Sequence, residues 1–207
     1  MTVAIVQARM TSKRFPGKVV APLLGKPVLQ HVLERVKKIG VAKVICAFPE
    51  DPRSAPILKI CRDMHVIAFA GPELDVLERY YLAAESVGAD RIMRITADCP
   101  FLCPKTCDDV LSLSVKEDLD YCSNVYPERS FPRGLDCEVF TFDALEAAHL
   151  NAEDPLYREH VTTWMQRTPG LNIGTVKSKE DNGKLNYCVD YPFDIQRLEA
   201  IWTEANE

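Results

Sequence analysis

Residues 3–18 read VAIVQARMTSKRFPGK, an apolar run followed at once by a loop rich in arginine and lysine. The run Val3-Ala4-Ile5-Val6 predicts a buried strand, because short apolar runs bounded by turn signals are typical of parallel sheets. Ligands of open α/β sheets bind beyond the carboxyl ends of the strands. We therefore expect the loop to bind a polyanion through exposed side chains; the alternative is a solvated basic loop.

The loop has no glycine-rich phosphate-binding motif, and this indicates how it would bind phosphate. It matches neither G-x-x-x-x-G-K-[ST] nor G-x-G-x-x-G, so backbone amides of a glycine-rich turn are not its main phosphate ligands. Arginine supplies planar paired donors and lysine a mobile point charge, and together they suit a triphosphate. The loop therefore predicts phosphate binding by side chains.

In the rest of the chain, short apolar runs alternate with segments that have the periodicity of amphipathic helices, which is the pattern of βαβ units. No glycine- or serine-rich linker divides residues 1–207, and 47% hydrophobic content supports a sizeable core. The sequence therefore predicts one α/β domain with an open, mainly parallel sheet and helices on both faces. The expected helices cover residues 27–40, 55–64, 74–87 and 193–202, and the expected strands 41–48, 66–69, 91–95 and, as a strand-like stretch, 185–189.

Charge and hydropathy exclude several classes of protein. A net charge of −5 argues against a general nucleic-acid binder, which needs an excess of lysine and arginine. No stretch approaches 18 uninterrupted apolar residues, and the first residues do not resemble a signal peptide. We expect a soluble, cytoplasmic protein that contacts no membrane.

The eight cysteines are expected to be reduced. Cys99, Cys103 and Cys107 have a spacing of four, but Pro100 and Pro104 interrupt the segment and no C-x-x-C pair exists. The other cysteines lie among apolar neighbours. We interpret all eight as structural residues.

Two aspartates are candidates for a metal site. Asp98 follows the expected strand 91–95, and Asp190 follows the stretch 185–189, so both carboxylates can meet at one edge of the sheet. Mg²⁺ is typically held by one or two carboxylates together with substrate phosphates. The alternative for each is a turn or a helix cap. Asp194 is expected mainly to stabilise the dipole of the last helix.

Several stretches of the chain together have the motifs of a known family. They are the pattern Ala8-Arg9-x-x-Ser12-x-Arg14-x-Pro16-x-Lys18 and residues 71–79, 95–100, 133–138, 158–162 and 189–194. In these stretches the chain resembles the sugar-activating cytidylyltransferases, the group of CMP-sialic acid and CMP-Kdo synthetases, and within it the spore coat polysaccharide SpsF-like branch. The resemblance implies a nucleotidyltransferase (GT-A-like) fold, CTP and a sugar acceptor as substrates, Mg²⁺ as cofactor, and a homodimer.

The resemblance also implies roles for single residues. Arg9 and Lys18 neutralise the triphosphate, Arg14 assists the leaving pyrophosphate, and Asp98 with Asp190 holds Mg²⁺. Nucleotide contacts are expected from Ala8, Arg9, Ser12, Arg14, Lys18, Gly71 and Arg79, and acceptor contacts from Arg133, Asp136, Glu138 and His160.

Alternatives remain for several of these residues. Arg79 can be a solvent-facing helix residue, His160 a structural histidine, and the group Arg133, Asp136 and Glu138 a surface cluster of ion pairs. The irregular residues 121–150 are expected to form a small lobe for the acceptor or for dimerisation.

Two other classes of protein compete with a cytidylyltransferase. A glycosyltransferase shares this kind of sheet, and Asp118-Leu119-Asp120 offers a D-x-D motif, but the triplet precedes a strand, on the wrong side for a metal. A non-catalytic nucleotide sensor would retain Arg9 and Lys18 without needing the two aspartates.

Overall fold

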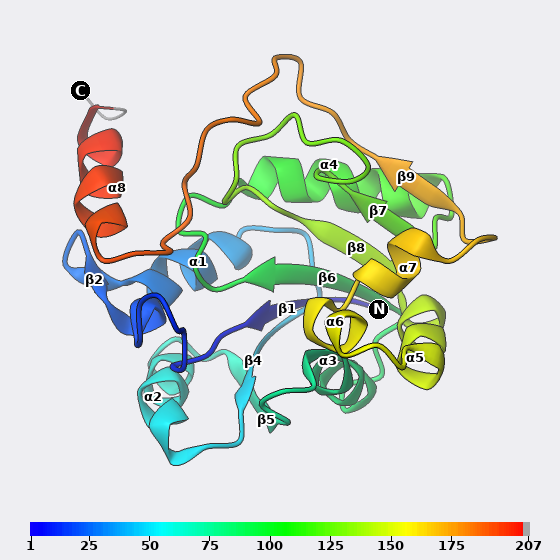
Figure 1. Cartoon of the computed structure of the whole chain (residues 1–207), viewed down its shortest axis with the longest axis horizontal. Coiled ribbons are helices and arrows are strands. Elements are labelled where there is room, and N and C mark those ends of the chain that lie inside the picture. The colour runs from blue at the N-terminus through cyan, green and yellow to red at the C-terminus, as the bar shows by residue number, and fades with distance from the viewer. Residues whose placement is uncertain (205–207) are drawn as a thin grey trace.

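The computed structural model describes residues 1–204, which form a seven-stranded sheet between two layers of helices (Figure 1). Within these residues six strands of the sheet are parallel and one runs antiparallel to both neighbours. This confirms the predicted class of fold. Across the sheet the strands are β5 (Ile67–Gly71), β4 (Lys43–Pro49), β1 (Thr2–Gln7), β6 (Arg91–Thr96), β8 (Glu138–Thr141, the antiparallel one), β7 (Tyr121–Ser123) and β9 (Ile173–Thr175).

The helices divide between the two faces of the sheet. In chain order the described residues form α1 (Val28–Val36), α2 (Ala55–Asp63), α3 (Val76–Glu85), α4 (Pro104–Lys116), α5 (Phe142–Asn151), α6 (Pro155–His160), α7 (Thr163–Arg167) and α8 (Phe193–Glu204). Successive side chains of a strand point to opposite faces. Ala4 and Val6 accordingly pack with α1, α2 and α4, whereas Val3 and Ile5 pack with α3, α5 and α7.

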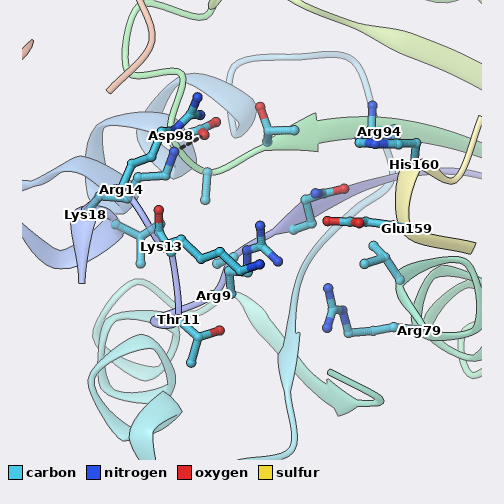
Figure 2. Close-up of a pocket in the computed structure, with 17 residues that line it drawn as sticks. Arg9, Thr11, Lys13, Arg14, Lys18, Arg79, Arg94, Asp98, Glu159 and His160 are labelled. Carbon is cyan, nitrogen blue, oxygen red and sulfur yellow. Dashed lines mark hydrogen bonds and ion pairs between the residues drawn. The ribbon is translucent and has the colours of Figure 1, made fainter. Parts of the chain in front are cut away.

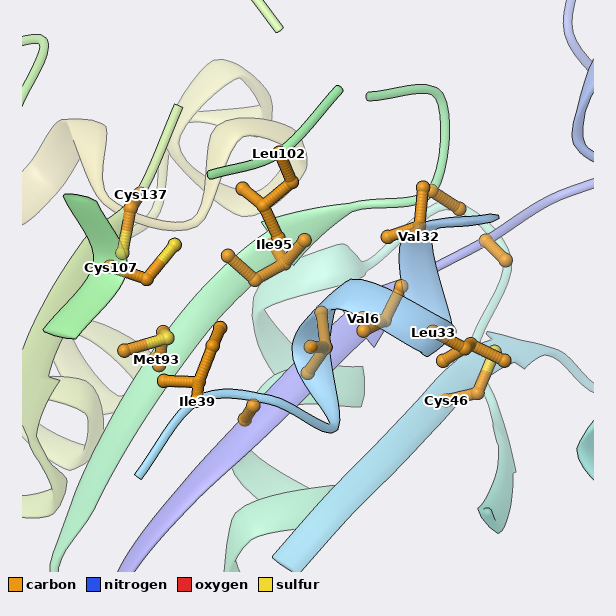
Figure 3. Close-up of a cluster of buried hydrophobic side chains, with 14 of the residues drawn as sticks. Val6, Val32, Leu33, Ile39, Cys46, Met93, Ile95, Leu102, Cys107 and Cys137 are labelled. Carbon is orange, nitrogen blue, oxygen red and sulfur yellow. The ribbon is translucent and has the colours of Figure 1, made fainter. Parts of the chain in front are cut away.

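The core under α1, α2 and α4 is made mainly of aliphatic and sulfur side chains (Figure 3). Val6, Met93 and Ile95 come from the sheet, and Val32 and Leu33 from α1; all five are fully buried. All eight cysteines are free thiols and seven are buried, as the sequence predicts. Five of them, Cys46, Cys61, Cys107, Cys122 and Cys137, pack in this core.

Short elements complete the fold. A 3₁₀ turn (Lys18–Val20) and the ribbon of β2 (Pro22–Leu23) and β3 (Lys26–Pro27) follow the loop after β1, and a second 3₁₀ turn (Pro52–Ser54) precedes α2. The last helix, α8, packs its Leu198 against Leu23, Val28 and Val189. Within residues 1–204, none of the helices has the length and hydrophobicity needed to cross a bilayer.

Several predicted boundaries were wrong. The first helix ends at Val36 instead of near Gly40. The helix expected from Leu74 starts at Val76, because Asp75 caps it by accepting a hydrogen bond from the Glu78 amide at 2.9 Å; Leu74 is 89% exposed. Stretch 185–189 is not a strand, apart from one isolated bridge between Asn186 and Arg133.

Residues 121–150 contribute β7, β8 and α5, and the strands belong to the main sheet. The irregular part of this segment is the loop between Asn124 and Cys137. Dimerisation through this segment stays a prediction.

Candidate active site

A cavity of about 480 Å³ opens beyond the carboxyl ends of β1 and β6 (Figure 2). The loop after β1 forms one wall, and residues of α3 and α6 form the other. Cationic side chains come from both walls. Eight of the predicted site residues line it, namely Ala8, Arg9, Ser12, Arg14, Lys18, Arg79, Asp98 and His160.

The loop after β1 is held in shape by backbone hydrogen bonds. The Ala8 amide donates to Ala47 of β4 at 3.0 Å, and the Gly17 amide donates to Met10 at 2.9 Å. Gly17 has φ of 74°, a conformation that side chains disfavour, so this bend requires glycine. The 3₁₀ turn that follows directs Lys18 inward.

Lys18 joins the two predicted metal ligands. Its Nζ lies 2.5 Å from Asp98 Oδ2 and 3.2 Å from Asp190 Oδ1, and Arg14 Nη2 lies 2.5 Å from the same Asp190 oxygen. The Lys18 side chain is only 10% exposed. The expectation of an exposed lysine was wrong, because two acids draw the ammonium into the protein.

Lys18 and Asp98 each stabilise the charged form of the other. Burial lowers the pKa of Lys18, but Asp98 and Asp190 more than offset the effect, so the pKa is raised. Burial raises the pKa of Asp98, and Lys18 reverses that effect, so the pKa lies below the ordinary 3.8. Both groups are therefore charged at neutral pH.

Asp190 reaches the cluster through a turn and not at the end of a strand. The Val189 amide donates to the Asp98 carbonyl oxygen at 2.9 Å, which joins the two segments directly. Asp194 Oδ2 then accepts hydrogen bonds from the Asp190 and Tyr191 amides at 2.9 and 2.8 Å. Asp194, an acid in the first turn of α8, thus fixes the Asp190 backbone.

The two aspartates fit a divalent cation. Because one ammonium nitrogen contacts both carboxylates, the carboxylates are within reach of a single ion. Carboxylate oxygens are the ligands that Mg²⁺ prefers in proteins. Asp98 and Asp190 would hold the metal, and Lys18 would then be released toward the phosphates.

Arg79 lies at another part of the cavity and is 2% exposed. Its Nη1 donates to the Pro72 carbonyl oxygen at 2.7 Å, whereas its buried Nε has no partner among residues 1–204. Burial lowers its pKa. Gly71 does not line the cavity; a Cβ there would lie 3.1 Å from Arg79 Cγ, so the missing side chain makes room for Arg79.

The predicted acceptor residues are divided between places. His160 is exposed to the first cavity. Arg133 and Asp136 line a second cavity of about 340 Å³, and Asp136 forms a two-point ion pair with Arg129 at 2.6 and 2.9 Å. The assignment of Glu138 to direct acceptor contact is corrected, because its carboxylate is buried and bonded within the protein.

Gly134 allows the loop after β7 to lie against the segment that precedes Asp190. A Cβ at this position would lie 2.7 Å from the Tyr187 backbone, and φ is 96°. Only glycine allows this close approach. The Tyr187 amide donates to the Arg133 carbonyl oxygen at 2.7 Å, so the segment before Asp190 is tied to the loop after β7.

A sequence profile of the cytidylyltransferase family matches residues 3–202. The chain belongs to the cytidylyltransferase family. An uncharacterized protein from Methanocaldococcus jannaschii is 37% identical over 170 residues, which are 82% of this chain and 68% of the relative. The spore coat polysaccharide biosynthesis protein SpsF of Bacillus subtilis is 27% identical over 212 residues, 98% of this chain and 87% of SpsF.

The fold of this cytidylyltransferase is shared with a solved relative. The structure of a cytidylyltransferase from Leptospira borgpetersenii matches it with a TM-score of 0.94 at 28% identity, covering 98% of this chain and 87% of that one. The resemblance drawn from the sequence motifs is therefore confirmed.

Sequence reasoning missed several residues of the cytidylyltransferase cavity. Lys13, Arg94 and Thr96 line it, as does Glu159, whose role the motifs left open. A signal for Arg94 existed: Arg94 and Thr96 alternate and so share one face of β6, two residues before Asp98. An arginine at an otherwise apolar position of a buried strand indicates a polar partner or a cavity, and Arg94 has both.

Proposed function

We propose that this cytidylyltransferase transfers CMP from CTP to an oxygen atom of an acidic sugar and releases pyrophosphate, in the synthesis of a surface or coat polysaccharide. The similarity to SpsF supports the polysaccharide role. The acidic keto sugar is supported by the resemblance of the motifs to CMP-sialic acid and CMP-Kdo synthetases.

The cluster of Lys18, Asp98 and Asp190 carries the proposal. A nucleotidyl transfer must neutralise a triphosphate and align an attacking oxygen with phosphorus. Bound Mg²⁺ supplies charge neutralisation of the phosphate oxygens. Asp98 and Asp190 hold the cation, Arg9 and Lys18 bind the triphosphate, and Arg14 stabilises the departing pyrophosphate. No protein nucleophile is needed.

The base is assigned to the part of the cavity near Ala8 and Arg79. Cytosine presents acceptors at O2 and N3, whereas uracil carries a hydrogen on N3. The Arg79 guanidinium is a donor-only group, and its buried Nε lacks a partner. Donors that meet two acceptors favour cytosine, because uracil would leave one donor facing a hydrogen.

The acceptor is placed beside Asp98, between the two cavities. Arg14, Thr96 and Asp98 line both of them. From this position an acceptor contacts His160 on one side and Arg133 and Asp136 on the other. His160→Ala and Arg133→Ala should each raise the acceptor KM while the CTP KM changes little; an unchanged acceptor KM removes that residue from the site.

The competing glycosyltransferase is disfavoured by the position of its D-x-D motif. Asp120 immediately precedes β7 and accepts a hydrogen bond from the Asn172 amide at 2.8 Å. It therefore lies at the amino end of a strand, whereas Asp98 lies beyond a carboxyl end. Metal-dependent turnover separates an enzyme from a nucleotide sensor.

The experiment combines each of the four ribonucleoside triphosphates with Mg²⁺ and a panel of 2-keto sugar acids, sugar phosphates and neutral sugars. Pyrophosphate release is the readout. The proposal expects release with CTP and an acidic sugar only. Equal release with UTP, or release with neutral sugars alone, would contradict it. Light scattering on the same samples tests the expected homodimer against a 23.3 kDa monomer.

A further inference from the structure

Glu138 forms a buried ion pair with Arg94 of the neighbouring strand. The two residues are directly opposite in the antiparallel pair of β8 and β6, and Arg94 Nη1 donates to Glu138 Oε2. Their side chains are 5% and 16% exposed. Burial raises the pKa of Glu138, but Arg94 and the hydroxyl donors reverse this, so the pKa is lowered and the carboxylate stays ionised.

The second carboxylate oxygen of Glu138 accepts three further hydrogen bonds. Glu138 Oε1 accepts hydrogen bonds from Tyr121 Oη at 2.6 Å, Thr162 Oγ1 at 2.8 Å and Gln166 Nε2 at 3.3 Å. Burying a carboxylate is costly unless its oxygens are bonded, and both oxygens of Glu138 are; the buried Nε of Arg94 finds no partner within residues 1–204 and faces the side of the cavity that Arg94 lines. Glu138 therefore connects β6, β7 and the segment that joins α6 to α7.

That segment contains a strained turn. Val161 has φ of 52° and ψ of −60°, and the Thr162 amide donates to the His160 carbonyl oxygen at 2.5 Å across it. This three-residue turn of positive φ is rare, and a β-branched residue in it is an outlier. Strain of this kind persists only where the surroundings fix it, and it concentrates at ligand sites. Val161 is fully buried, and Thr162 is tied to Glu138.

The turn and the ion pair meet at one side of the cavity. Glu159 and His160, just before the turn, are exposed and line the cavity with Arg94. In Figure 2 these three residues lie on one side of the view, and Lys18 and Asp98 lie on the other. The network of Glu138 thus reaches the cavity away from the cluster of Lys18 and the aspartates.

We propose that Glu138 is a positioning residue for the acceptor: it fixes Arg94 in the cavity wall and, through Thr162, the turn that presents His160. This inference rests on the proposed function, because it assumes that the acceptor beside Asp98 extends along the cavity to His160 and Arg94. Glu138 itself does not touch the substrate.

The first test measures kinetics of Glu138→Gln and Thr162→Val with CTP and the best acceptor of the panel. A displaced contact group commonly costs about 10²-fold in rate. We expect kcat/KM for the acceptor to fall by about that factor, with the Kd for CTP, measured without acceptor, unchanged within about twofold. Thr162→Ser keeps the hydroxyl and should retain activity.

A control separates positioning from stability. Val110→Ala removes buried methyl groups from α4, on the opposite face of the sheet, and destabilises the protein without touching the network. If Glu138→Gln and Thr162→Val weaken CTP and acceptor equally, as general loosening would, the proposal is overturned.

A second test needs no acceptor. Amide hydrogen exchange at residues 160–163 should accelerate in both variants, whereas exchange in the loop 9–18 should not change. Unchanged exchange at 160–163 overturns the positioning role. If no sugar supports turnover by the wild type, the proposed function fails while hydrogen exchange still decides whether Glu138 holds the turn.

Discussion

Replacing Lys18 by methionine removes the ammonium from between two acids. The contact distances of 2.5 and 3.2 Å place the two carboxylate oxygens no more than about 6 Å apart. At an effective dielectric constant of about 20, two negative charges at that separation repel by about 3 kcal/mol; a shorter separation raises this figure, and the ion pair of Arg14 with Asp190 lowers it. The variant should therefore be less stable than the wild type in the absence of a divalent metal.

The magnitude can be measured by thermal unfolding. For a chain of this length 1 kcal/mol corresponds to about 2–4 °C, so Lys18→Met should lower Tm in EDTA by roughly 6–12 °C. Saturating Mg²⁺ should recover most of the loss, because a cation replaces the ammonium. It should raise the Tm of the wild type less, since there the metal must displace Lys18. Turnover should fall by about 10²–10³.

The matched control is Lys13→Met, in the same loop. Lys13 is exposed, and its substitution should change stability by no more than about 0.5 kcal/mol. If Lys18→Met melts like the wild type in EDTA, or if Mg²⁺ stabilises both proteins equally, the two aspartates are not held together by this lysine and the reasoning is refuted.

The aspartates of the cluster, Arg79 and Glu138 can each be tested in the same way. Asp98→Asn and Asp190→Asn should each abolish most pyrophosphate release, and the double variant should be little worse, because we propose that both hold the same metal ion; additive losses in a Mg²⁺ titration argue for separate roles. Arg79→Met should raise the KM for CTP about tenfold or more and reduce the preference for CTP over UTP; an unchanged preference removes Arg79 from base recognition. The folded-state pKa of Glu138 is lowered from 4.5, so its contribution to stability is complete above about pH 4.5 and is lost as the pH falls through the folded pKa. Melting between pH 3 and 7 should show less acid destabilisation in Glu138→Gln than in the wild type, and identical profiles would count against an ionised Glu138.

The sequence predicted the fold well because its signals were local. The run Val3-Ala4-Ile5-Val6 and the helical stripes depend only on neighbouring residues, and they became β1 and the helices of both layers. The sequence also predicted that Asp98 and Asp190 lie close together, but the structural cause differs from the predicted one. Two strand ends were predicted, whereas a turn fixed by Asp194 and one hydrogen bond from Val189 bring them together.

The burial and the partners of the site residues could not be predicted from local sequence patterns. Lys18 is buried because two acids distant in sequence meet it, and no periodicity records this. Glu138 was predicted to contact the acceptor because its buried partners, which come from β6, β7 and residue Thr162, leave no local pattern in the sequence. The pairing of β8 with β6 that brings Arg94 to Glu138 is a property of the tertiary fold.

The central claim is that the bond broken in CTP lies between the α and β phosphorus atoms and that the CMP part joins a sugar. The most direct measurement supplies the protein, Mg²⁺ and an acidic sugar with CTP radiolabelled at either the α or the γ phosphorus, and separates the products. The account predicts α-label in the sugar product and γ-label in pyrophosphate. Transfer of γ-label to the sugar, or release of α-label as free CMP with no labelled sugar, would contradict it.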